Sequence, residues 1–261
     1  MKIIEIIRLL ESFASPELQE DYDNSGLITG NPEEECRAVL LSLDCTEEIV
    51  QEAIRKNANF IITHHPLIFR PVRRISTETE SGRTLLTAIR SGITIYAIHT
   101  NLDNIRDGVC AAMADRIGLV NRNILSPKPG LPAVGSGMIG DLENPLSEAV
   151  FLLRLKRQFG LRVIRHTNLT GRTVKSVALC GGAGSFLITN ALRAGVDFFV
   201  SADIKYHEFF QAEGRMVIAD IGHFESEQFT VDLLHDLILE KFPNFAVLKP
   251  EILTNPVQYY I

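Results

Sequence analysis

The sequence predicts an α/β protein made of two related α/β halves with mixed, mostly parallel sheets. Apolar runs of strand length alternate with amphipathic segments of helix length along most of the 261 residues. Such alternation is typical of parallel sheets covered by helices on both faces. A second observation is an internal repeat, because residues 53–63 resemble residues 191–201 at a constant offset of 138 positions. Val39 and Leu41 meet Val177 and Leu179 at the same offset, which favours a duplicated architecture.

Hydrophobic periodicity predicts the elements of the first half in order. Thr46 is a plausible N-cap, and Glu47 and Glu48 follow it in the first turn, where the helix dipole favours anions. The predicted elements are a helix over 3–13, a polar loop over 21–26, a strand over 38–43, a helix from Thr46 to about 56, a strand over 59–63, a helix over 82–90, a strand over 93–98 and a helix over 107–117.

A cluster of proline and glycine within 125–145 interrupts this pattern and indicates a linker or domain boundary. We therefore expect residues 1–125 with 226–261 to form a metal-binding α/β domain, and residues 126–225 to form a second α/β domain that contributes to the same site. The elements predicted after the cluster are a helix over 145–159, strands over 162–165 and 174–179, a helix over 185–194, a strand over 197–200, a helix over 206–212, a strand over 216–219, a helix over 226–242 and an extended tail from 246.

Composition narrows the class of protein. The net charge of −6 and the pI near 5.7 make nucleic acid an unlikely partner, since that binding needs a basic face. No uninterrupted apolar stretch approaches the roughly 20 residues that a membrane span requires. Charged residues within positions 1–10 break any signal-peptide core, so we expect a cytoplasmic protein. Its four cysteines form no CxxC pair and are expected to be buried, reduced thiols.

Potential metal ligands follow three of the predicted strands. His64 and His65 come directly after residues 60–63, His99 and Asp103 follow 95–98, and His223 and Glu227 follow 216–219. Ligands of open α/β sheets bind outside the carboxyl ends of the strands. Imidazoles and carboxylates are ligands of divalent metals such as zinc, iron, manganese and cobalt. The sequence therefore predicts a metalloprotein, and a hydrolase in particular.

Each of these residues also has a structural interpretation. A histidine at a strand end is often a hydrogen-bonded core residue, and Asp103 could serve as a helix cap. His99 is a candidate ligand, a partner of a ligand, or a proton shuttle. His207, beside Lys205, could orient substrate or move protons, or mark a solvated helix start. The glycine-rich turn 181–185 favours either phosphate binding by backbone N–H groups or close packing of a strand against a helix.

Five motifs in this order resemble the NIF-three-like dinuclear metal-centre proteins, which are also labelled GTP cyclohydrolase I type 2 homologues. The motifs are Asp23-Asn24-Ser25-Gly26-Leu27, Thr63-His64-His65-Pro66-Leu67-Ile68-Phe69, His99-Thr100-Asn101-Leu102-Asp103, Ser201-Ala202-Asp203-Ile204-Lys205-Tyr206-His207 and Gly222-His223-Phe224-Glu225-Ser226-Glu227. Two departures are Tyr22, where many members have Trp, and the lack of room for the inserted domain of longer members.

The resemblance implies two similar α/β halves, a toroidal homohexamer and a site for two divalent metal ions. Its ligands fall on His64, His65, Asp103, His223 and Glu227, with the carboxylates bridging the ions. It further implies a small-molecule substrate, in particular a purine nucleotide whose ring is opened by hydrolysis. His99 or His207 would act as general acid or base. The rival hypotheses are a metal-binding regulatory or protein-interaction module without catalysis, and a protein for metal storage or delivery.

Overall fold

The computed structural model describes residues 1–260, and the contacts within it divide the chain into two compact units. Unit 1 comprises Met1–Leu102 and Thr230–Gln258, and unit 2 comprises Asp103–Phe229 and the end of the chain from Tyr259. The division thus falls after residue 102 and after residue 229, whereas the sequence led us to expect boundaries after 125 and 225. Residue 261, which that expectation included, lies outside the described residues. None of the helices within residues 1–260 is both long and apolar enough to cross a membrane.

Unit 1 is built on a five-stranded sheet in the order β1-β4-β3-β2-β11. The neighbours β4, β3, β2 and β11 pair in parallel, and β1 pairs antiparallel with β4. The three central strands are buried along their whole length, as expected for strands covered on both faces. The strands are β1 (Gly26–Thr29), β2 (Val39–Ser42), β3 (Phe60–Thr63), β4 (Thr94–Ala97) and β11 (Val247–Leu248).

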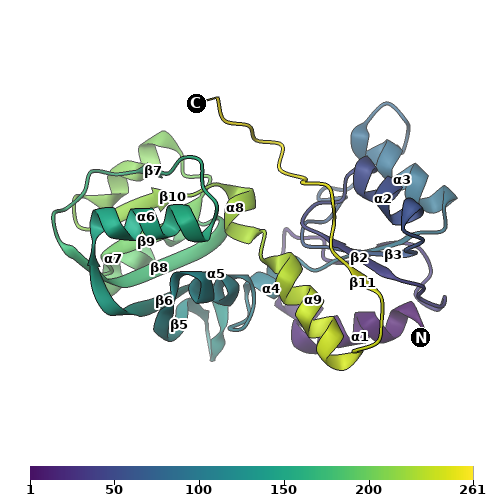
Figure 1. Ribbon diagram of the computed structural model, residues 1–261, viewed down its shortest axis with the longest axis horizontal. Coiled ribbons are helices and arrows are strands. Elements are labelled where there is room, and N and C mark those ends of the chain that lie inside the picture. The colour runs from purple at the N-terminus through teal and green to yellow at the C-terminus, as the bar shows by residue number, and fades with distance from the viewer. Residues whose placement is uncertain (261) are drawn as a thin grey trace. The chain divides into compact units, whose positions relative to one another are not determined.

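Helices cover both faces of this sheet (Figure 1). One face of the sheet packs against apolar residues of α2 and α3. This face includes Leu40 of β2, Ile61 of β3 and Ile95 of β4. On the opposite face lie α1 and α9, and the Tyr96 hydroxyl donates a 3.1 Å hydrogen bond to Glu11 of α1. The helices of this unit are α1 (Ile3–Phe13), η1 (Pro16–Leu18), α2 (Glu47–Arg55), α3 (Glu80–Arg90), α4 (Thr100–Asp103, at the border with unit 2) and α9 (Thr230–Lys241).

Unit 2 is built on a six-stranded mixed sheet in the order β5-β6-β8-β9-β10-β7. The central strands β8, β9 and β10 are parallel, and antiparallel strands flank them on both sides. The strands are β5 (Leu119–Lys128), β6 (Leu131–Ser147), β7 (Arg165–His166), β8 (Thr173–Ala183), β9 (Phe198–Ala202) and β10 (Val217–Asp220).

The two faces of this sheet carry separate apolar clusters. Val177, Phe198 and Val217 face the helices α5 and α6, whereas their neighbours Ala178 and Phe199 face α7 and η3. This alternation follows from the period of two along a strand. The helices are α5 (Val109–Ile117), α6 (Glu148–Gln158), η2 (Ser185–Leu187), α7 (Ile188–Ala194), η3 (Tyr206–Ala212) and α8 (His223–Glu227).

The fold class predicted from the sequence is confirmed, but the proposed linker over 125–145 is wrong. Those residues form most of an antiparallel hairpin, β5 and β6, that pairs with β8. Pro127 is tolerated because β5 is an edge strand, and Gly135, which lies opposite Pro127, adopts a positive φ next to an irregular part of the ladder. The hairpin begins at Leu119, and α5 before it packs into the same core, so residues 103–125 belong to unit 2. The predicted helix over 226–242 is also interrupted, since α8 ends at Glu227 and α9 begins at Thr230.

The internal repeat is confirmed by the pairing registers. In unit 1, Val39 of β2 lies opposite Phe60 of β3. In unit 2, Val177 of β8 lies opposite Phe198 of β9, which is the same pair displaced by 138 positions. The helix preceding the second strand of each pair, α2 or α7, is placed equivalently in the sequence. The two units therefore share a strand–helix–strand frame.

Candidate metal-binding site

Three histidines of unit 1 converge at the carboxyl ends of β3 and β4. The ring centroids of His64 and His65 are 5.0 Å apart, and His99 lies 5.1 Å from His64 and 5.4 Å from His65. One ring nitrogen from each histidine lies within 4.8 Å of the other two. His64 is fully buried, and the other two rings are half-buried. The nitrogens are therefore close enough to share a bound cation.

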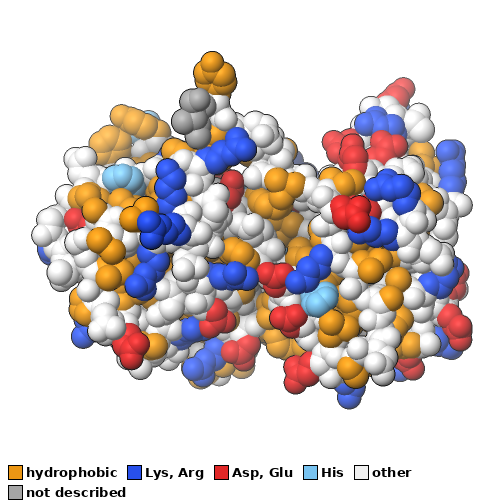
Figure 2. Space-filling view, in the orientation of Figure 1, with side chains coloured by type: hydrophobic (Ala, Val, Ile, Leu, Met, Phe, Trp, Pro, Cys, Tyr) orange, Lys and Arg blue, Asp and Glu red, His pale blue; other side chains and the backbone are white. Residues whose placement is uncertain are grey.

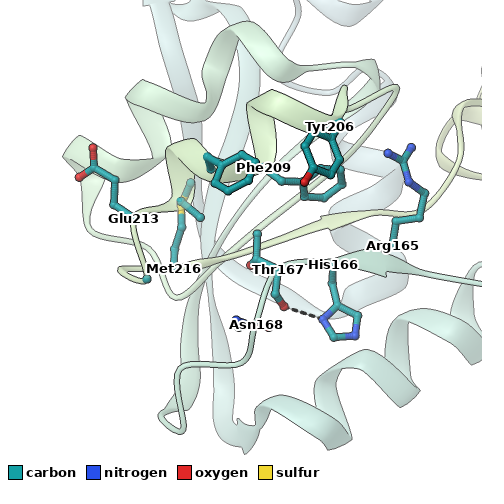
Figure 3. A pocket seen from close by; sticks show the side chains of 11 residues that line it. Arg165, His166, Thr167, Asn168, Tyr206, Phe209, Glu213 and Met216 are labelled. Carbon is teal, nitrogen blue, oxygen red and sulfur yellow. Dashed lines mark hydrogen bonds between the residues drawn. The ribbon is translucent and has the colours of Figure 1, made fainter.

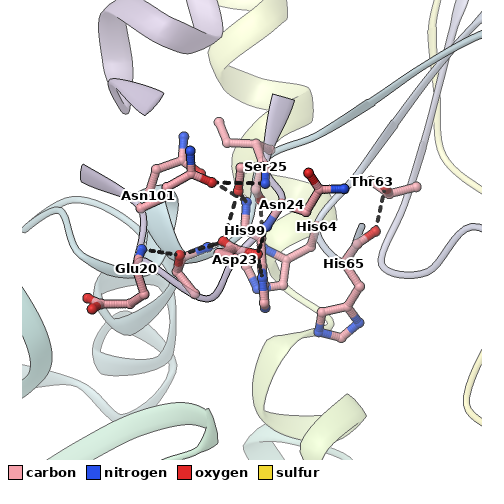
Figure 4. A network of polar contacts seen from close by, with 12 residues as sticks. Glu20, Asp23, Asn24, Ser25, Thr63, His64, His65, His99 and Asn101 are labelled. Atoms are coloured by element: carbon pink, nitrogen blue, oxygen red, sulfur yellow. Dashed lines mark hydrogen bonds and ion pairs between the residues drawn. The ribbon is translucent and has the colours of Figure 1, made fainter. Parts of the chain in front are cut away.

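Backbone hydrogen bonds beyond the ends of the strands place these rings. The amides of His64 and His65 donate to the carbonyls of Ser42 and Leu43 at 3.3 and 2.9 Å, so the chain continues along β2 after β3 has ended. The Thr63 hydroxyl donates to the His65 carbonyl at 2.8 Å. Neighbouring side chains point to opposite faces along a regular strand. Beyond the end of β3, His64 and His65 can both approach the same edge of the sheet (Figure 4).

The Nδ1 atom of each ring is held by an oxygen. His64 Nδ1 lies 2.9 Å from the Ile98 carbonyl, His65 Nδ1 lies 2.7 Å from Asp44 Oδ1, and His99 Nδ1 lies 2.8 Å from Asp23 Oδ1. Carbonyls and carboxylates can only accept, so Nδ1 donates and Nε2 carries the lone pair. This orientation is the one that metal-binding histidines adopt in proteins.

Asp23 is the most strongly anchored of these oxygen partners. Its side chain is fully buried and accepts hydrogen bonds from His99, the Thr100 amide and hydroxyl, and the Ser25 hydroxyl (Figure 4). Burial alone would raise the pKa of this carboxyl, but the hydrogen bonds from His99 and Thr100 outweigh it and hold the pKa well below its usual value. Asp23 is therefore a permanent anion behind the His99 ring.

Unit 2 presents a second group of potential ligands around α8. His223 and Glu227 are four residues apart on this helix, and His223 Nε2 lies 3.1 Å from Glu227 Oε2. His223 Nδ1 lies 2.7 Å from Asp203 Oδ2, so both ring nitrogens face carboxylates. A nitrogen and an oxygen that each lie about 2.0–2.2 Å from one ion are separated by roughly 3 Å. The spacing of His223 and Glu227 therefore fits ligands of one cation.

Asp103, also of unit 2, belongs to the same group. One of its carboxylate oxygens lies within 4.8 Å of a carboxylate oxygen of Glu227, which is 3% exposed. Both carboxylates act on the buried thiol of Cys180. Its pKa is raised well above the ordinary value by the hydrogen bond with Cys110 and by burial, and then by Asp103 and Glu227. Two carboxylates so close together in a buried setting are a favourable environment for a cation.

The glycines of the 181–185 turn explain how this group fits against β8. A Cβ atom on Gly182 would lie 2.3 Å from Glu227 Oε1 and 3.1 Å from His223 Cε1, and its φ is +58°. The Gly182 amide donates to the Ser226 hydroxyl at 2.9 Å. Of the two interpretations of these glycines, the structure therefore supports close packing. The segment lets α8 approach the strand, and its amide at Gly182 is engaged by the protein itself.

The structure thus distributes the expected site residues over two groups. His64, His65 and His99 form the group of unit 1, and Asp103, His223 and Glu227 form the group of unit 2. His207 belongs to neither group. It lies exposed on η3 and makes ring contacts with Tyr206 and Phe210. Sequence reasoning overlooked Asp44, although its position directly after the strand 38–43 is the same signal that identified the histidines.

The sequence matches the model of one family over residues 1–256, described as Duf34/NIF3 (NGG1p interacting factor 3). A relative from Clostridium acetobutylicum is 32% identical over 229 residues, which cover 87% of this chain and 85% of the relative. A relative from Lactococcus lactis is 31% identical over 261 residues, covering 98% of both chains. Each relative is named "GTP cyclohydrolase 1 type 2 homolog".

Solved structures agree with this assignment. A Bacillus cereus protein related to NIF3 superimposes with a TM-score of 0.93 at 25% identity, covering 100% of this chain and 99% of the other. A hypothetical protein from Staphylococcus aureus gives the same TM-score and coverage at 29% identity. The motifs, the fold and the match along nearly the whole sequence lead to one conclusion: the chain belongs to the Duf34/NIF3 family.

Proposed function

We propose that this protein is a metal-dependent hydrolase with a dinuclear centre held by His64, His65, Asp103, His223 and Glu227. The observation that carries the proposal is the orientation of the imidazoles. In both units Nδ1 is bonded to a carbonyl or carboxylate oxygen, and this supports Nε2 as the ligand atom. The donor set of imidazole and carboxylate without thiolate suits zinc, iron, manganese or cobalt.

Two divalent ions held in such a centre would supply a water of lowered pKa as nucleophile. The side chains of the protein have separate tasks around it. Glu227 and Asp103, the two carboxylates, would help to hold the ions and offset their charge. His99 is the proposed general acid or base, because the buried Asp23 anion fixes its Nδ1 proton and leaves Nε2 to exchange a proton with substrate. His207 lies on the exposed surface of η3, and no comparable partner fixes its ring among the contacts described for residues 1–260.

For the substrate we propose a purine nucleotide, hydrolysed at the carbon between the two nitrogens of the five-membered ring. This part of the proposal is supported by the name of the relatives, GTP cyclohydrolase 1 type 2 homolog. A ring carbon flanked by two nitrogens is an electrophile that hydroxide can attack, with the ring nitrogen as leaving group. Protonation of that nitrogen is the step assigned to His99.

Metal content tests the ligand assignment. His64→Ala and Glu227→Ala are each expected to lose at least one equivalent of metal per chain while the circular dichroism spectrum stays unchanged. His235→Ala is the matched control, because His235 is a half-buried histidine bonded only to the adjacent Asp236 among the contacts seen in residues 1–260. Unchanged metal content in both ligand variants would refute the assignment.

An activity screen tests the reaction. Protein loaded separately with zinc, iron, manganese or cobalt is incubated with GTP and other purine nucleotides, and formate and ring-opened product are measured. His99→Ala is expected to retain metal yet lose turnover by about 10²–10⁴-fold. If His99→Ala loses metal as well, His99 is a ligand and the proton-transfer role is wrong.

The second candidate function is a metal-binding regulatory or interaction module. The family description, NGG1p interacting factor 3, favours it because it names an interaction and no reaction. Absence of turnover with every metal, together with full metal occupancy, would support this alternative. We also propose a homohexamer, as the family resemblance implies, and light scattering coupled to gel filtration would measure the mass of the assembly.

A further inference from the structure

A pocket of about 730 Å³ opens on unit 2, bordered by η3 and by β7 with the loop that follows it. In Figure 3 the aromatic residues Tyr206 and Phe209 lie on one side of the pocket, and His166 and Asn168 lie on the other. The volume falls within the range of pockets that hold small organic ligands. None of the residues that line it is a proposed metal ligand.

The aromatic side of the pocket is unusually accessible. Tyr206 and Phe210 are 70% and 67% exposed, and their ring centroids are 5.5 Å apart in an edge-to-face arrangement. Aromatic side chains normally bury their large apolar surface, so two adjacent exposed rings mark a place where another apolar surface binds. The open faces of these rings are suited to a flat, aromatic ligand.

One end of the pocket is cationic. Arg165 donates to Asp220 at 3.0 Å and to the Ile204 carbonyl at 2.9 Å, and its guanidinium lies 5.1 Å from the centre of the Phe209 ring. A guanidinium has five N–H donors, so this fixed and half-exposed fork retains donors for an anion. His166 Nδ1 donates to the Thr167 carbonyl at 2.7 Å, so Nε2 carries the lone pair and Arg165 is the donor at this end.

The segment that contains Arg165 is basic. Between residues 149 and 196 there are eight Lys and Arg residues and neither Asp nor Glu. Figure 2 shows Lys and Arg side chains gathered over α6 and near β7 on this face of unit 2. Glu213, the carboxylate that lines the pocket, lies at the opposite end from Arg165 (Figure 3). The pocket therefore favours one anionic group, held at the end where Arg165 lies.

We propose that this pocket binds a planar aromatic ring that carries a single anionic group, as in a nucleoside monophosphate or an aryl carboxylate. The ring stacks on one of the two rings of Tyr206 and Phe210 and meets the other edge to face, and the anion bonds to the Arg165 guanidinium. The Thr167 hydroxyl and the Asn168 amide supply polar contacts to the ring edge. This site is separate from the proposed metal centre and does not depend on the proposed hydrolysis.

Calorimetric titration of the full-length protein tests the ligand chemistry. AMP is the probe for a nucleotide, and indole-3-acetate is the probe for an aryl carboxylate. Adenosine lacks the anion, and inorganic phosphate lacks the ring. At least one of the two aromatic anions is expected to bind about tenfold or more tightly than both adenosine and phosphate, and the tighter one identifies the source of the ligand. Equal binding with and without EDTA is expected, since no metal takes part.

Variants of exposed aromatic residues locate the binding. Phe210→Ala and Tyr206→Ala should each weaken the binding of the aromatic anion about tenfold, the order of a lost stacking contact. Phe186→Ala is the matched control, since Phe186 is 63% exposed in the same unit but does not line the pocket. All three residues are exposed enough for their truncation to leave the fold intact. Failure of both probes to bind, loss of binding in EDTA, or an equal loss in Phe186→Ala would overturn the proposal.

Discussion

The two units share a frame but carry different chemistry at its ends. The pair Val39 and Phe60 in unit 1 and the pair Val177 and Phe198 in unit 2 occupy the same register. Beyond the end of the second strand of each pair, His65 of unit 1 corresponds to Asp203 of unit 2 at the offset of 138. The difference teaches that the two copies share the apolar interior of the repeat but differ in the polar residues that follow the strands.

The difference between the residues that follow the strands also alters what each unit can contribute to a metal site. Unit 1 offers three imidazoles that oxygen atoms hold in place, and unit 2 offers two carboxylates beside one imidazole. In unit 1 the anion behind His99 is the fully buried Asp23, whereas in unit 2 the anion behind His223 is Asp203, which is 54% exposed. The imidazole-rich group therefore has the more rigid support.

The largest effect should come from the shared frame. Phe60→Ala and Phe198→Ala each remove a fully buried ring, and each is expected to lower the free energy of unfolding by about 3–5 kcal/mol. The loss should be greater for Phe198, whose ring packs edge-on against Phe151 at 4.8 Å between centroids. Urea unfolding followed by circular dichroism measures both. A cost below about 1 kcal/mol for either variant would show that the two copies are not equivalent in packing.

The carboxylates behind the imidazoles provide the next contrast. Asp23→Asn should cost about 2–4 kcal/mol, because a buried and multiply hydrogen-bonded anion is replaced by an amide that cannot accept every bond. Asp203→Asn should cost less than about 1 kcal/mol, because its bond to His223 is exposed to water. Thermal and urea unfolding of the two variants at neutral pH test this order. Equal costs would contradict the difference in burial.

Asp23 also predicts a dependence on pH. Its pKa is depressed in the folded state, so its stabilising contribution is present above the ordinary carboxyl pKa of about 4 and is lost as the pH falls below that value. Stability measured between pH 6 and 2.5 should therefore fall less steeply in Asp23→Asn than in the unmodified protein. Parallel curves would remove Asp23 as the source of this acid sensitivity.

Substitutions at two glycines separate the effect of a steric clash with a neighbouring side chain from the effect of backbone strain. Gly182→Ala should cost about 1–3 kcal/mol and reduce metal content, because a Cβ there would lie 2.3 Å from Glu227 Oε1. Gly195→Ala is the control, with φ +70° and no atom within 4 Å of its Cβ, so only the backbone term of about 1 kcal/mol remains. Metal analysis and unfolding of the two variants are compared. A drop in metal content for Gly195→Ala would undermine the explanation.

The smallest effect concerns the cysteines, two of which lie in each unit. Burial raises the pKa of Cys36 and of Cys45 to about 12, and the pKa of Cys180 is also raised, by its bond with Cys110 and by burial. Thiolates are the reactive form, so native protein at pH 8 should show almost no labelling by a maleimide. Full labelling is expected only in denaturant. Rapid labelling of one thiol in the native state would identify an opening that the structure does not show.

Sequence periodicity predicted the buried parallel strands and most of the helices, because their apolar pattern is local. It did not predict β5 and β6, whose prolines and glycines resemble a linker when the partner strands are not known. Nor did it predict β1 and β11, which are short edge strands that depend on pairing for their existence. The boundary expected after residue 125 rested on the same prolines and glycines, whereas the contacts of the chain place residues 103–125 in unit 2.

By itself, the sequence determined the family, the α/β class, the internal repeat and the identity of the candidate ligands. These follow from local patterns, namely apolar periodicity and short polar motifs after strands. Only the tertiary structure decided which oxygens hold the imidazoles, that Gly182 makes room for Glu227, and that exposed rings of η3 border a pocket with Arg165 and His166. The physical reason is that hydrogen bonds and close packing join residues far apart in the chain, and their geometry exists only after folding.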